Sequence, residues 1–231
     1  MRIAVIGAGR MGALRTEDLI KVGAEVTVFN RTLAGAKTLA DKFNSQHGEI
    51  SDIQKSKFDA YVVATATDSH IGLLEELIPL GKPILCEKPI SLTVEDTDLV
   101  IEDCKKFGTQ IQVGFQRRFD PDFQALRAEI DAGHIGEVEM ITLISRDPGA
   151  PPYDYIERSG GIFRDMMIHD FDVARWMLGE EVETVQAAGS VLTDPEIGNR
   201  GDFDSANAIL RTASGKQCTI SNSRRATFGY D

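Results

Sequence analysis

A glycine-rich turn near the N-terminus constrains the fold more than any other feature of this chain. The run Gly7-Ala8-Gly9-Arg10-Met11-Gly12 has the pattern G-x-G-x-x-G, directly follows the apolar run Ile3–Ile6 and opens a helical pattern. In this context the first glycine permits a tight turn, the second lets the backbone approach a pyrophosphate, and the third lets the helix pack close to the strand. The unpaired N–H groups at the start of the helix attract the anion. The sequence therefore predicts a βαβ unit that binds a dinucleotide.

Short β-rich runs alternate with longer helical patterns up to about residue 115. This alternation predicts an α/β fold, a doubly wound parallel sheet covered by helices. Unbroken apolar runs such as Tyr61–Ala64 fit strands that are buried on both faces. The expected strands are 3–6, 25–29, 60–64, 83–87 and 110–115, and the expected helices are 11–22, 34–43, 69–80 and 93–107.

The pattern changes after about residue 118. We expect a helix over 120–131, a β-rich run over 137–146, one helical segment over 161–178, and strands near 182–190, 206–211 and 217–225. Strands grouped together with few helices predict an α+β domain built on an open, mainly antiparallel sheet. The predicted domains are an NAD(P)-binding Rossmann domain over 1–117 and a substrate and oligomerisation domain over 118–231.

Composition excludes several classes of function. Lys and Arg total 25 against 36 Asp and Glu, a net charge of −11, so the chain lacks the basic footprint of a nucleic-acid-binding protein. No apolar run is long enough to cross a bilayer, and the first apolar run is too short for the core of a signal peptide. Cys86, Cys104 and Cys218 are far apart without metal-ligand spacing, which predicts reduced, buried thiols in a cytoplasmic protein.

The end of the second expected strand bears on the choice of dinucleotide. Asn30, followed by Arg31 and Thr32, occupies the place where NAD sites usually carry an Asp or Glu that binds the ribose 2′-hydroxyl. A carboxylate would repel a 2′-phosphate, whereas Asn30 would not and Arg31 could pair with it. The alternative is that the three residues simply form a polar turn and helix cap. We favour NADP(H) over NAD(H).

Two segments carry the residues best suited to chemistry. Lys88 follows Glu87 at the carboxyl end of an expected strand, where ligands bind in open α/β sheets. Asp165 and His169 are four residues apart and would share one helix face, with Asp172 one turn further along. A carboxylate beside an imidazole fixes its tautomer and raises its basicity, which suits a general base. Each feature alone also fits an ordinary solvated surface.

Taken in order, five motifs resemble the Gfo/Idh/MocA oxidoreductase family. They are the glycine turn, the segment Thr65–His70, Glu87-Lys88-Pro89, the run Gly114–Pro121 and the pattern Asp165-x-x-x-His169. Three runs in the second half are similar to the inositol 2-dehydrogenase branch: Ile144–Pro148, Gly160–Asp165, and Asn222–Arg225 with Phe228–Asp231. Family members continue past this last run, so the resemblance implies a chain that is short at its C-terminus, with an incomplete second domain.

The resemblance implies a nicotinamide-dependent enzyme that oxidises a CH–OH group of a small polyol, without a metal. Lys88 would hydrogen-bond the reacting oxygen, His169 would accept the hydroxyl proton, and Asp165 would orient His169. It also implies a homo-oligomer. The cofactor contacts would come from Gly7, Ala8, Gly9, Arg10, Met11, Gly12, Asn30, Arg31, Thr32, Thr65, Thr67, His70, Glu87 and Lys88, and the polyol contacts from Arg118, Asp147 and Tyr230.

Two alternatives to an inositol 2-dehydrogenase stay open. The first is a related sugar or polyol dehydrogenase or reductase, for example one acting on scyllo-inositol or on a sugar nucleotide, because substrate choice rests on the shape of the pocket. The second is a non-catalytic NAD(P)-binding regulator. A regulator would be expected to lose the lysine or the histidine, and both Lys88 and His169 are present.

Overall fold

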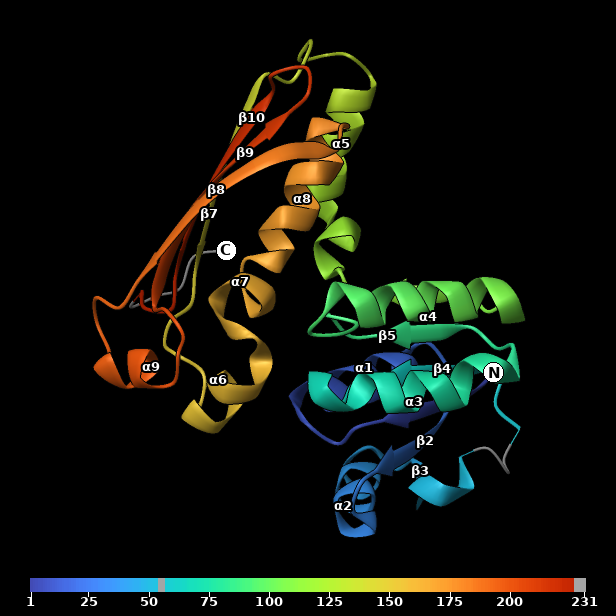
Figure 1. Ribbon diagram of the computed structural model, residues 1–231. Helices are drawn as coiled ribbons and strands as arrows, with labels where there is room; N and C mark the ends of the chain where they lie inside the picture. Colours follow the sequence, from blue (N-terminus) through green and yellow to red (C-terminus); the bar gives the residue numbers. More distant parts are fainter. Residues whose placement is uncertain (54–56, 227–231) are drawn as a thin grey trace. The chain divides into compact units, whose positions relative to one another are not determined.

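The chain folds into two compact units, residues 1–114 and 115–231. The structure, a computed structural model, describes residues 1–53 and 57–226 (Figure 1). Across these residues no helix is both long and apolar enough to span a membrane. Each unit is built on its own sheet and its own hydrophobic core, so each is described by itself.

The first unit contains a six-stranded parallel sheet with the strand order β3-β2-β1-β4-β5-β6 (Figure 1). This is the doubly wound arrangement predicted from the alternation of strands and helices. The strands are β1 (Arg2–Ile6), β2 (Glu25–Asn30), β3 (Gln46–Glu49), β4 (Ala60–Val63), β5 (Ile84–Cys86) and β6 (Ile111–Val113). The α-helices are α1 (Arg10–Lys21), α2 (Leu33–Phe43), α3 (His70–Leu77) and α4 (Val94–Phe107), with 3₁₀ turns at Ile50–Asp52, Thr67–Ser69 and Ile78–Leu80.

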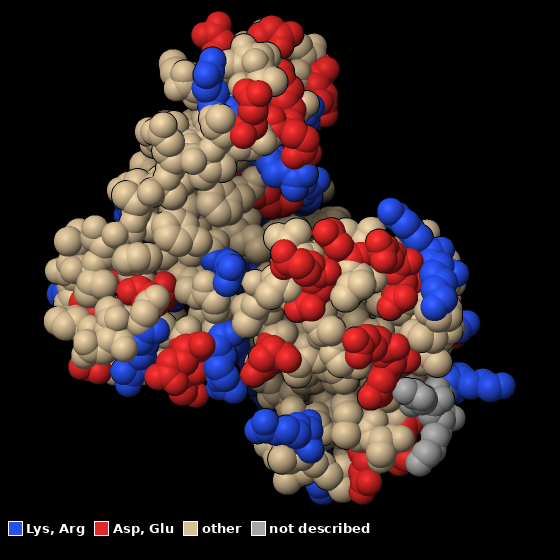
Figure 2. All heavy atoms as spheres, in the orientation of Figure 1, with Lys and Arg blue, Asp and Glu red and all other residues tan. Residues whose placement is uncertain are grey.

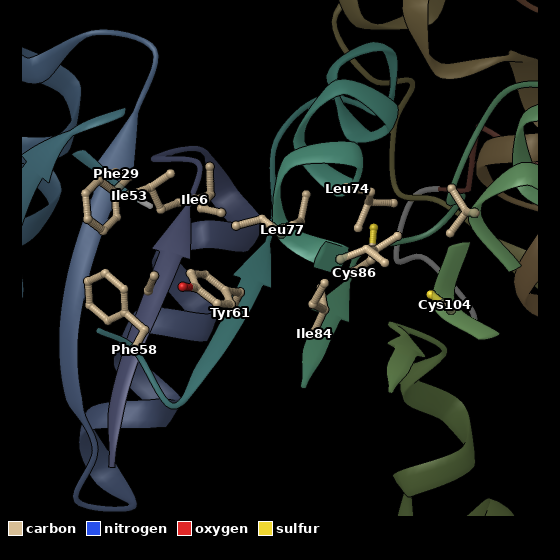
Figure 3. Packing of buried hydrophobic residues seen from close by; sticks show 14 residues of the cluster. Ile6, Phe29, Ile53, Phe58, Tyr61, Leu74, Leu77, Ile84, Cys86 and Cys104 are labelled. Atoms are coloured by element: carbon tan, nitrogen blue, oxygen red, sulfur yellow. The ribbon is translucent and has the colours of Figure 1, made fainter. Parts of the chain in front are cut away.

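Alternate residues of the central strands build separate cores on the two faces of this sheet. On β1, Ile3 and Val5 pack with residues of α1 and α2, whereas Ala4 and Ile6 pack with residues of α3 and α4. Figure 3 shows the second core, in which the rings of Phe29, Phe58 and Tyr61 lie edge to face. Burial on both faces explains why these strands read as continuous apolar runs.

The sequence patterns missed β3. This four-residue edge strand, Gln46–Glu49, contains no alternation of apolar and polar residues, and all of its positions are exposed or half-buried. It pairs with β2 in parallel, and Gly48 fits against the ring of Phe29, where a Cβ atom would lie 2.6 Å from the ring. Tertiary contact, rather than β propensity, therefore defines this strand.

The second unit contains a four-stranded sheet with the order β7-β10-β9-β8. β8–β9 and β9–β10 are antiparallel and β10–β7 is parallel, so the sheet is mainly antiparallel, as predicted. The strands are β7 (Met140–Arg146), β8 (Val182–Ser190), β9 (Ser205–Thr212) and β10 (Gln217–Ser223). The helices are α5 (Pro121–Asp131), α6 (Tyr153–Ser159), α7 (Gly161–Asp165), α8 (Ile168–Leu178) and α9 (Pro195–Asn199), preceded by a 3₁₀ turn at Gln116–Phe119.

One face of this second sheet is covered by α7 and α8. Ile162, Met167 and Leu178 pack against alternate residues of β9 and β10, including Leu210 and Ile220. Other side chains of the sheet are exposed, among them Met140, Ile144, Val185 and Ile209. The surface over these strands is largely free of charge in Figure 2, whereas acidic and basic side chains mix elsewhere on the visible face.

The carboxylate of Asp204 organises the turn between β8 and α9. It is 1% exposed and accepts hydrogen bonds of 2.7–3.0 Å from the backbone N–H groups of Leu192, Thr193 and Asp194 and from the hydroxyl of Thr193. Burial acts to raise the pKa of this carboxyl, but the backbone and hydroxyl hydrogen bonds outweigh burial and hold the pKa well below its usual range. The turn therefore depends on the charged form of Asp204.

We expect Asp204→Asn to lower the free energy of unfolding by about 1–3 kcal/mol at neutral pH, because buried N–H groups lose an acceptor oxygen. The folded pKa lies below the unfolded value of about 3.9, so the carboxylate stabilises the fold above that pH and loses this effect as the pH falls through the folded pKa. Urea unfolding at about pH 7 and about pH 3 measures both effects. The difference between wild type and variant should narrow at the lower pH; an unchanged difference would show that the charge contributes nothing.

Candidate functional site

The glycine turn lies at the carboxyl end of β1, and its geometry leaves little choice of residue. Gly7 has φ +117°, and a Cβ atom there would lie 2.4 Å from the carbonyl oxygen of Ala64. A Cβ atom at Gly12 would lie 1.9 Å from the carbonyl oxygen of Gly7, so α1 packs directly on the turn. Gly9, which precedes α1, has open space where a side chain would be. An exposed helix N-terminus with a bare backbone beside it fits a pyrophosphate.

The other residues of the turn divide between the core and the surface. Ala8 and Met11 pack against the core between the sheet and α1, whereas Arg10 is exposed. At the end of β2, Asn30 Oδ1 accepts a hydrogen bond of 3.3 Å from the N–H of Ala8, and Asn30 Nδ2 donates to Thr32. Thr32 in turn caps α2, and Arg31 is exposed. Asn30 thus fixes the glycine turn to the start of α2 with a neutral side chain.

The segment after β4 is held by a buried histidine. His70 is 1% exposed, and its Nδ1 and Nε2 atoms lie 2.9 Å and 3.2 Å from the carbonyl oxygens of Pro89 and Thr65. Thr65 Oγ1 accepts a hydrogen bond from Ser69, and Thr67 begins the 3₁₀ turn that leads into α3. His70 therefore ties the 65–70 segment to Pro89, whose peptide bond with Lys88 is cis.

Glu87 is buried at the end of β5 and pairs with a residue that the sequence patterns did not single out. Nε and Nη2 of Arg15, on α1, both lie 2.8 Å from Glu87 Oε1. A Cβ atom at Gly114 would lie 2.7 Å from Glu87 Oε2, so the carboxylate also packs on backbone. Lys88 is half-buried next to it. Arg15 thereby links the helix behind the glycine turn to the strand end that carries Lys88.

These residues gather at one edge of the first sheet. Parallel strands place all their carboxyl ends together, and the glycine turn, Asn30, Thr65 and Glu87 follow β1, β2, β4 and β5. The predicted cofactor contacts are thus brought together by the strand order β2-β1-β4-β5. This edge combines an anion-binding backbone with polar side chains.

The expectation of one helix over 161–178 is wrong. α7 ends at Asp165 and α8 begins at Ile168, with a turn at Met166 and Met167 between them. The break arises because the carbonyl oxygen of Ile162 accepts from the N–H of Met166 at 3.0 Å and from that of Met167 at 2.8 Å, which widens the turn. Asp165 and His169 therefore lie on consecutive short helices rather than on one face of a single helix.

Both of these side chains are partly buried in the second unit. Tyr155, on α6, donates a hydrogen bond of 2.8 Å from its hydroxyl to Asp165 Oδ1. The ring of Phe115 lies edge to face against the imidazole of His169, with the centroids 6.4 Å apart. An aromatic wall and a hydrogen-bonded carboxylate suit a general base and its orienting group.

The residue after His169 anchors α8 to the sheet. Asp170 is 1% exposed; its Oδ1 accepts from Arg117 Nη1 at 2.6 Å and Ser145 Oγ at 2.7 Å, and its Oδ2 accepts from Asn222 Nδ2 at 2.7 Å. The three donors come from the 3₁₀ turn after Phe115, from β7 and from β10. This buried cluster was not identified from the sequence, because its members are dispersed along the chain. It fixes the position of the helix that carries His169.

The three residues predicted to contact the polyol have different environments. Arg118 pairs with Asp172 through Nε and Nη2, at 2.8–3.1 Å, and stacks on Trp176. Asp147 directly follows β7 and is half-buried, with its N–H donating to the carbonyl oxygen of Ser223. Tyr230 lies outside the described residues.

The cysteines are buried, unpaired thiols, as expected. Burial, helped by the nearby Glu87, raises the pKa of Cys86 to about 12, and burial with the nearby Asp170 raises that of Cys218 to about 12. Protonated thiols are poor nucleophiles and poor metal ligands. Within residues 1–53 and 57–226 no group of three His, Cys, Asp or Glu side chains has the geometry to hold a metal ion.

Comparison with known proteins shows relatives along the whole chain. Residues 1–115 match the model of an oxidoreductase family with an NAD-binding Rossmann fold, and residues 123–231 match that of the GFO/IDH/MocA C-terminal domain. The chain is 48% identical to an inositol 2-dehydrogenase of Rhizobium meliloti and 42% identical to a myo-inositol 2-dehydrogenase of Thermotoga maritima, covering all of this chain and 71% of each relative. The solved structure of a scyllo-inositol dehydrogenase from Lactobacillus casei, with NAD(H) and scyllo-inositol bound, superposes with a TM-score of 0.91 at 25% identity, covering 100% of this chain and 72% of that one.

We expect Asp170→Asn to lower the free energy of unfolding by about 3–5 kcal/mol, because it leaves the buried guanidinium of Arg117 without its carboxylate. Asp154→Asn is the matched control, since Asp154 is 79% exposed in its pair with Arg158 and should cost less than about 1 kcal/mol. Denaturant unfolding of both variants measures the difference. Equal losses would contradict an anchoring role for Asp170.

Proposed function

We propose that this chain, which belongs to the Gfo/Idh/MocA family of oxidoreductases, is an inositol 2-dehydrogenase. It would transfer a hydride between a nicotinamide dinucleotide and a secondary alcohol of the cyclic polyol. The observation that carries the proposal is the bare backbone at Gly9 between β1 and α1, together with 48% identity to an inositol 2-dehydrogenase. A chain that had become a regulator would be free to lose Lys88 and His169, and both are retained.

The residues at the edge of the first sheet fit a dinucleotide. The glycine turn and the N-terminus of α1 would hold the pyrophosphate, and the 65–70 segment would lie beside the nicotinamide ribose. When bound, the nicotinamide ring supplies the chemistry of hydride transfer. The protein binds the dinucleotide and the polyol, orients them, and accepts the proton of the hydroxyl group.

The side chains divide the work of alcohol oxidation between them. The imidazole of His169 takes the hydroxyl proton as general base. Asp165 orients this imidazole and offsets the charge that it gains. The ammonium group of Lys88 donates a hydrogen bond to the reacting oxygen and stabilises the developing alkoxide. Arg118, Asp147 and Tyr230 are the proposed polyol contacts, although the guanidinium of Arg118 already engages Asp172.

Of the two dinucleotides, NAD(H) and NADP(H), we propose NADP(H) as the cofactor. The polar side chain at the end of β2 is the neutral Asn30, held by Ala8 and Thr32, so a 2′-phosphate meets no carboxylate from this position. Arg31 is exposed next to it and can pair with the phosphate.

Lys88→Ala and His169→Ala should each lower kcat by about 10²–10⁴-fold. The Kd for the dinucleotide should change far less, because Lys88 is only one of many proposed cofactor contacts and His169 is not among them. Reduction of NAD⁺ and NADP⁺ with myo-inositol, followed by absorbance, gives kcat, and quenching of protein fluorescence gives Kd. Lys82→Ala and His134→Ala, at exposed positions, are the matched controls. Full turnover in either active-site variant would refute its assigned role. Turnover with scyllo-inositol but not with myo-inositol would instead identify scyllo-inositol, which is bound in the Lactobacillus casei structure, as the substrate.

Arg31→Ala should lower kcat/KM for NADP⁺ by about tenfold or more, because a charge-assisted hydrogen bond to phosphate contributes about 1.5–3 kcal/mol. Asn30→Asp should lower kcat/KM for NADP⁺ and raise it for NAD⁺, since the new carboxylate repels the phosphate and accepts from the 2′-hydroxyl. Parallel titrations with both dinucleotides measure the ratio. A ratio that neither variant changes would mean that the end of β2 does not select the cofactor.

A further inference from the structure

Arg224 is a fully buried arginine placed between two carboxylates. It follows β10 directly, its side chain is 1% exposed, and its N–H donates to the carbonyl oxygen of Asp204 at 2.8 Å. Its Nη2 lies 2.9 Å from Asp202 Oδ2, and its Nη1 lies 3.7 Å from Asp165 Oδ2. Burying a charge is costly unless it is paired, and here two carboxylates pair with the guanidinium.

The Arg224–Asp202 pair holds both ends of α7. Asp202 Oδ1 accepts a hydrogen bond of 2.8 Å from the N–H of Ile162 in the first turn of the helix. Gly161 has φ +80°, and a Cβ atom there would lie 2.7 Å from Asp202 Oδ1, so the carboxylate lies directly against the backbone. Arg224 reaches the other end of this five-residue helix, where Asp165 is the last residue. One ion pair thereby sets the position of the helix.

The carboxylate of Asp165 is held from two sides. Tyr155 donates a hydrogen bond to Oδ1, and Arg224 forms an ion pair with Oδ2 at 3.7 Å, so each oxygen of the carboxylate has a polar neighbour. Asp165 is 14% exposed, whereas Asp202 and Arg224 are 5% and 1% exposed. Of the three ionic groups, Asp165 is therefore the one that retains access to the surroundings, and the buried pair stands behind it.

We propose that Arg224, anchored by Asp202, is a positioning residue that orients Asp165 for its work beside His169. This inference rests on the catalytic role given to Asp165 in the proposed function. The positive charge of the Arg224 guanidinium offsets the two carboxylates around it. Its planar fork serves both partners at once, which a point charge cannot do in the same geometry.

A double-mutant cycle on kcat separates positioning from mere support of the fold. Arg224→Met should lower kcat about 10²-fold in the wild-type background, because a small displacement of a group at the reacting centre costs that much. In the Asp165→Asn background the same change should lower kcat by no more than about twofold, since the residue through which Arg224 acts has already been altered. Arg224→Lys keeps the positive charge but loses the planar fork, so its kcat should lie between those of the wild type and Arg224→Met.

Three measurements serve as controls for this cycle. Arg225→Met removes the neighbouring, exposed arginine and should leave kcat unchanged. The Kd for the dinucleotide should stay the same in all variants, because its contacts belong to the first unit. Thermal unfolding sets a temperature at which each variant is folded, since Arg224→Met leaves Asp202 buried without its partner.

Each outcome decides the matter. A loss of kcat for Arg224→Met that is equally large in both backgrounds would show that Arg224 only supports the fold, and would overturn this inference while the proposed function stands. Full kcat in the single variant Asp165→Asn would overturn this inference together with the role given to Asp165, while the inositol dehydrogenase activity itself would stand. Should Arg224→Met fail to fold, Asp202→Asn provides the same cycle: it leaves Arg224 in place without its anchor, and the same non-additivity with Asp165→Asn is expected.

Discussion

The contact between Gly12 and the carbonyl oxygen of Gly7 is the constraint on which the first unit depends. It is too close for any side chain, and it sets the distance between α1 and β1. From this distance follow the accessible N–H groups at the start of α1 and the reach of Arg15 to the buried carboxylate of Glu87. Glu87 directly precedes Lys88. The contact between Gly12 and Gly7 therefore shapes the anion site and also helps to place Lys88, the proposed hydrogen-bond donor to the reacting oxygen.

Charge, rather than apolar packing alone, fixes the helices of the second unit. Asp170 joins α8 to β7 and β10, while the pair of Asp202 and Arg224 joins α7 to the end of β10. Buried ionic groups contribute little net stability compared with apolar residues of the same shape, but they tolerate only one arrangement of partners. Here they hold α7 and α8 to the sheet alongside the apolar contacts of Ile162 and Leu178. Because Asp165 lies on α7 and His169 on α8, these contacts also determine where the two side chains lie.

The architecture of both sheets follows from patterns that can be read in the sequence. Continuous apolar runs predict strands buried on both faces, and the glycine pattern predicts the turn after β1. What the sequence could not give depends on contacts between distant residues. β3 pairs with β2 where Gly48 fits against Phe29, and the break between α7 and α8 depends on the hydrogen bonds accepted by Ile162. In the same way, the partners of Glu87 and Asp170 and the Arg224 that faces Asp165 are separated from them by long stretches of chain, so no local spacing reveals them.

The strand order of the second sheet also governs the sequence of events in folding. Among the residues that the structure describes, β7 pairs only with β10 in this sheet, and Met140 lies opposite Gln217. Contacts between residues so distant along the chain require a long loop to close first, which makes them slow to form. During synthesis from the N-terminus, β7 and α8 are made before β10. The contacts of Asn222 with Asp170 and of Arg224 with Asp165 can therefore form only once β10 has been made. The surroundings of the proposed catalytic base are thus completed only after the dinucleotide-binding unit has all of its strands.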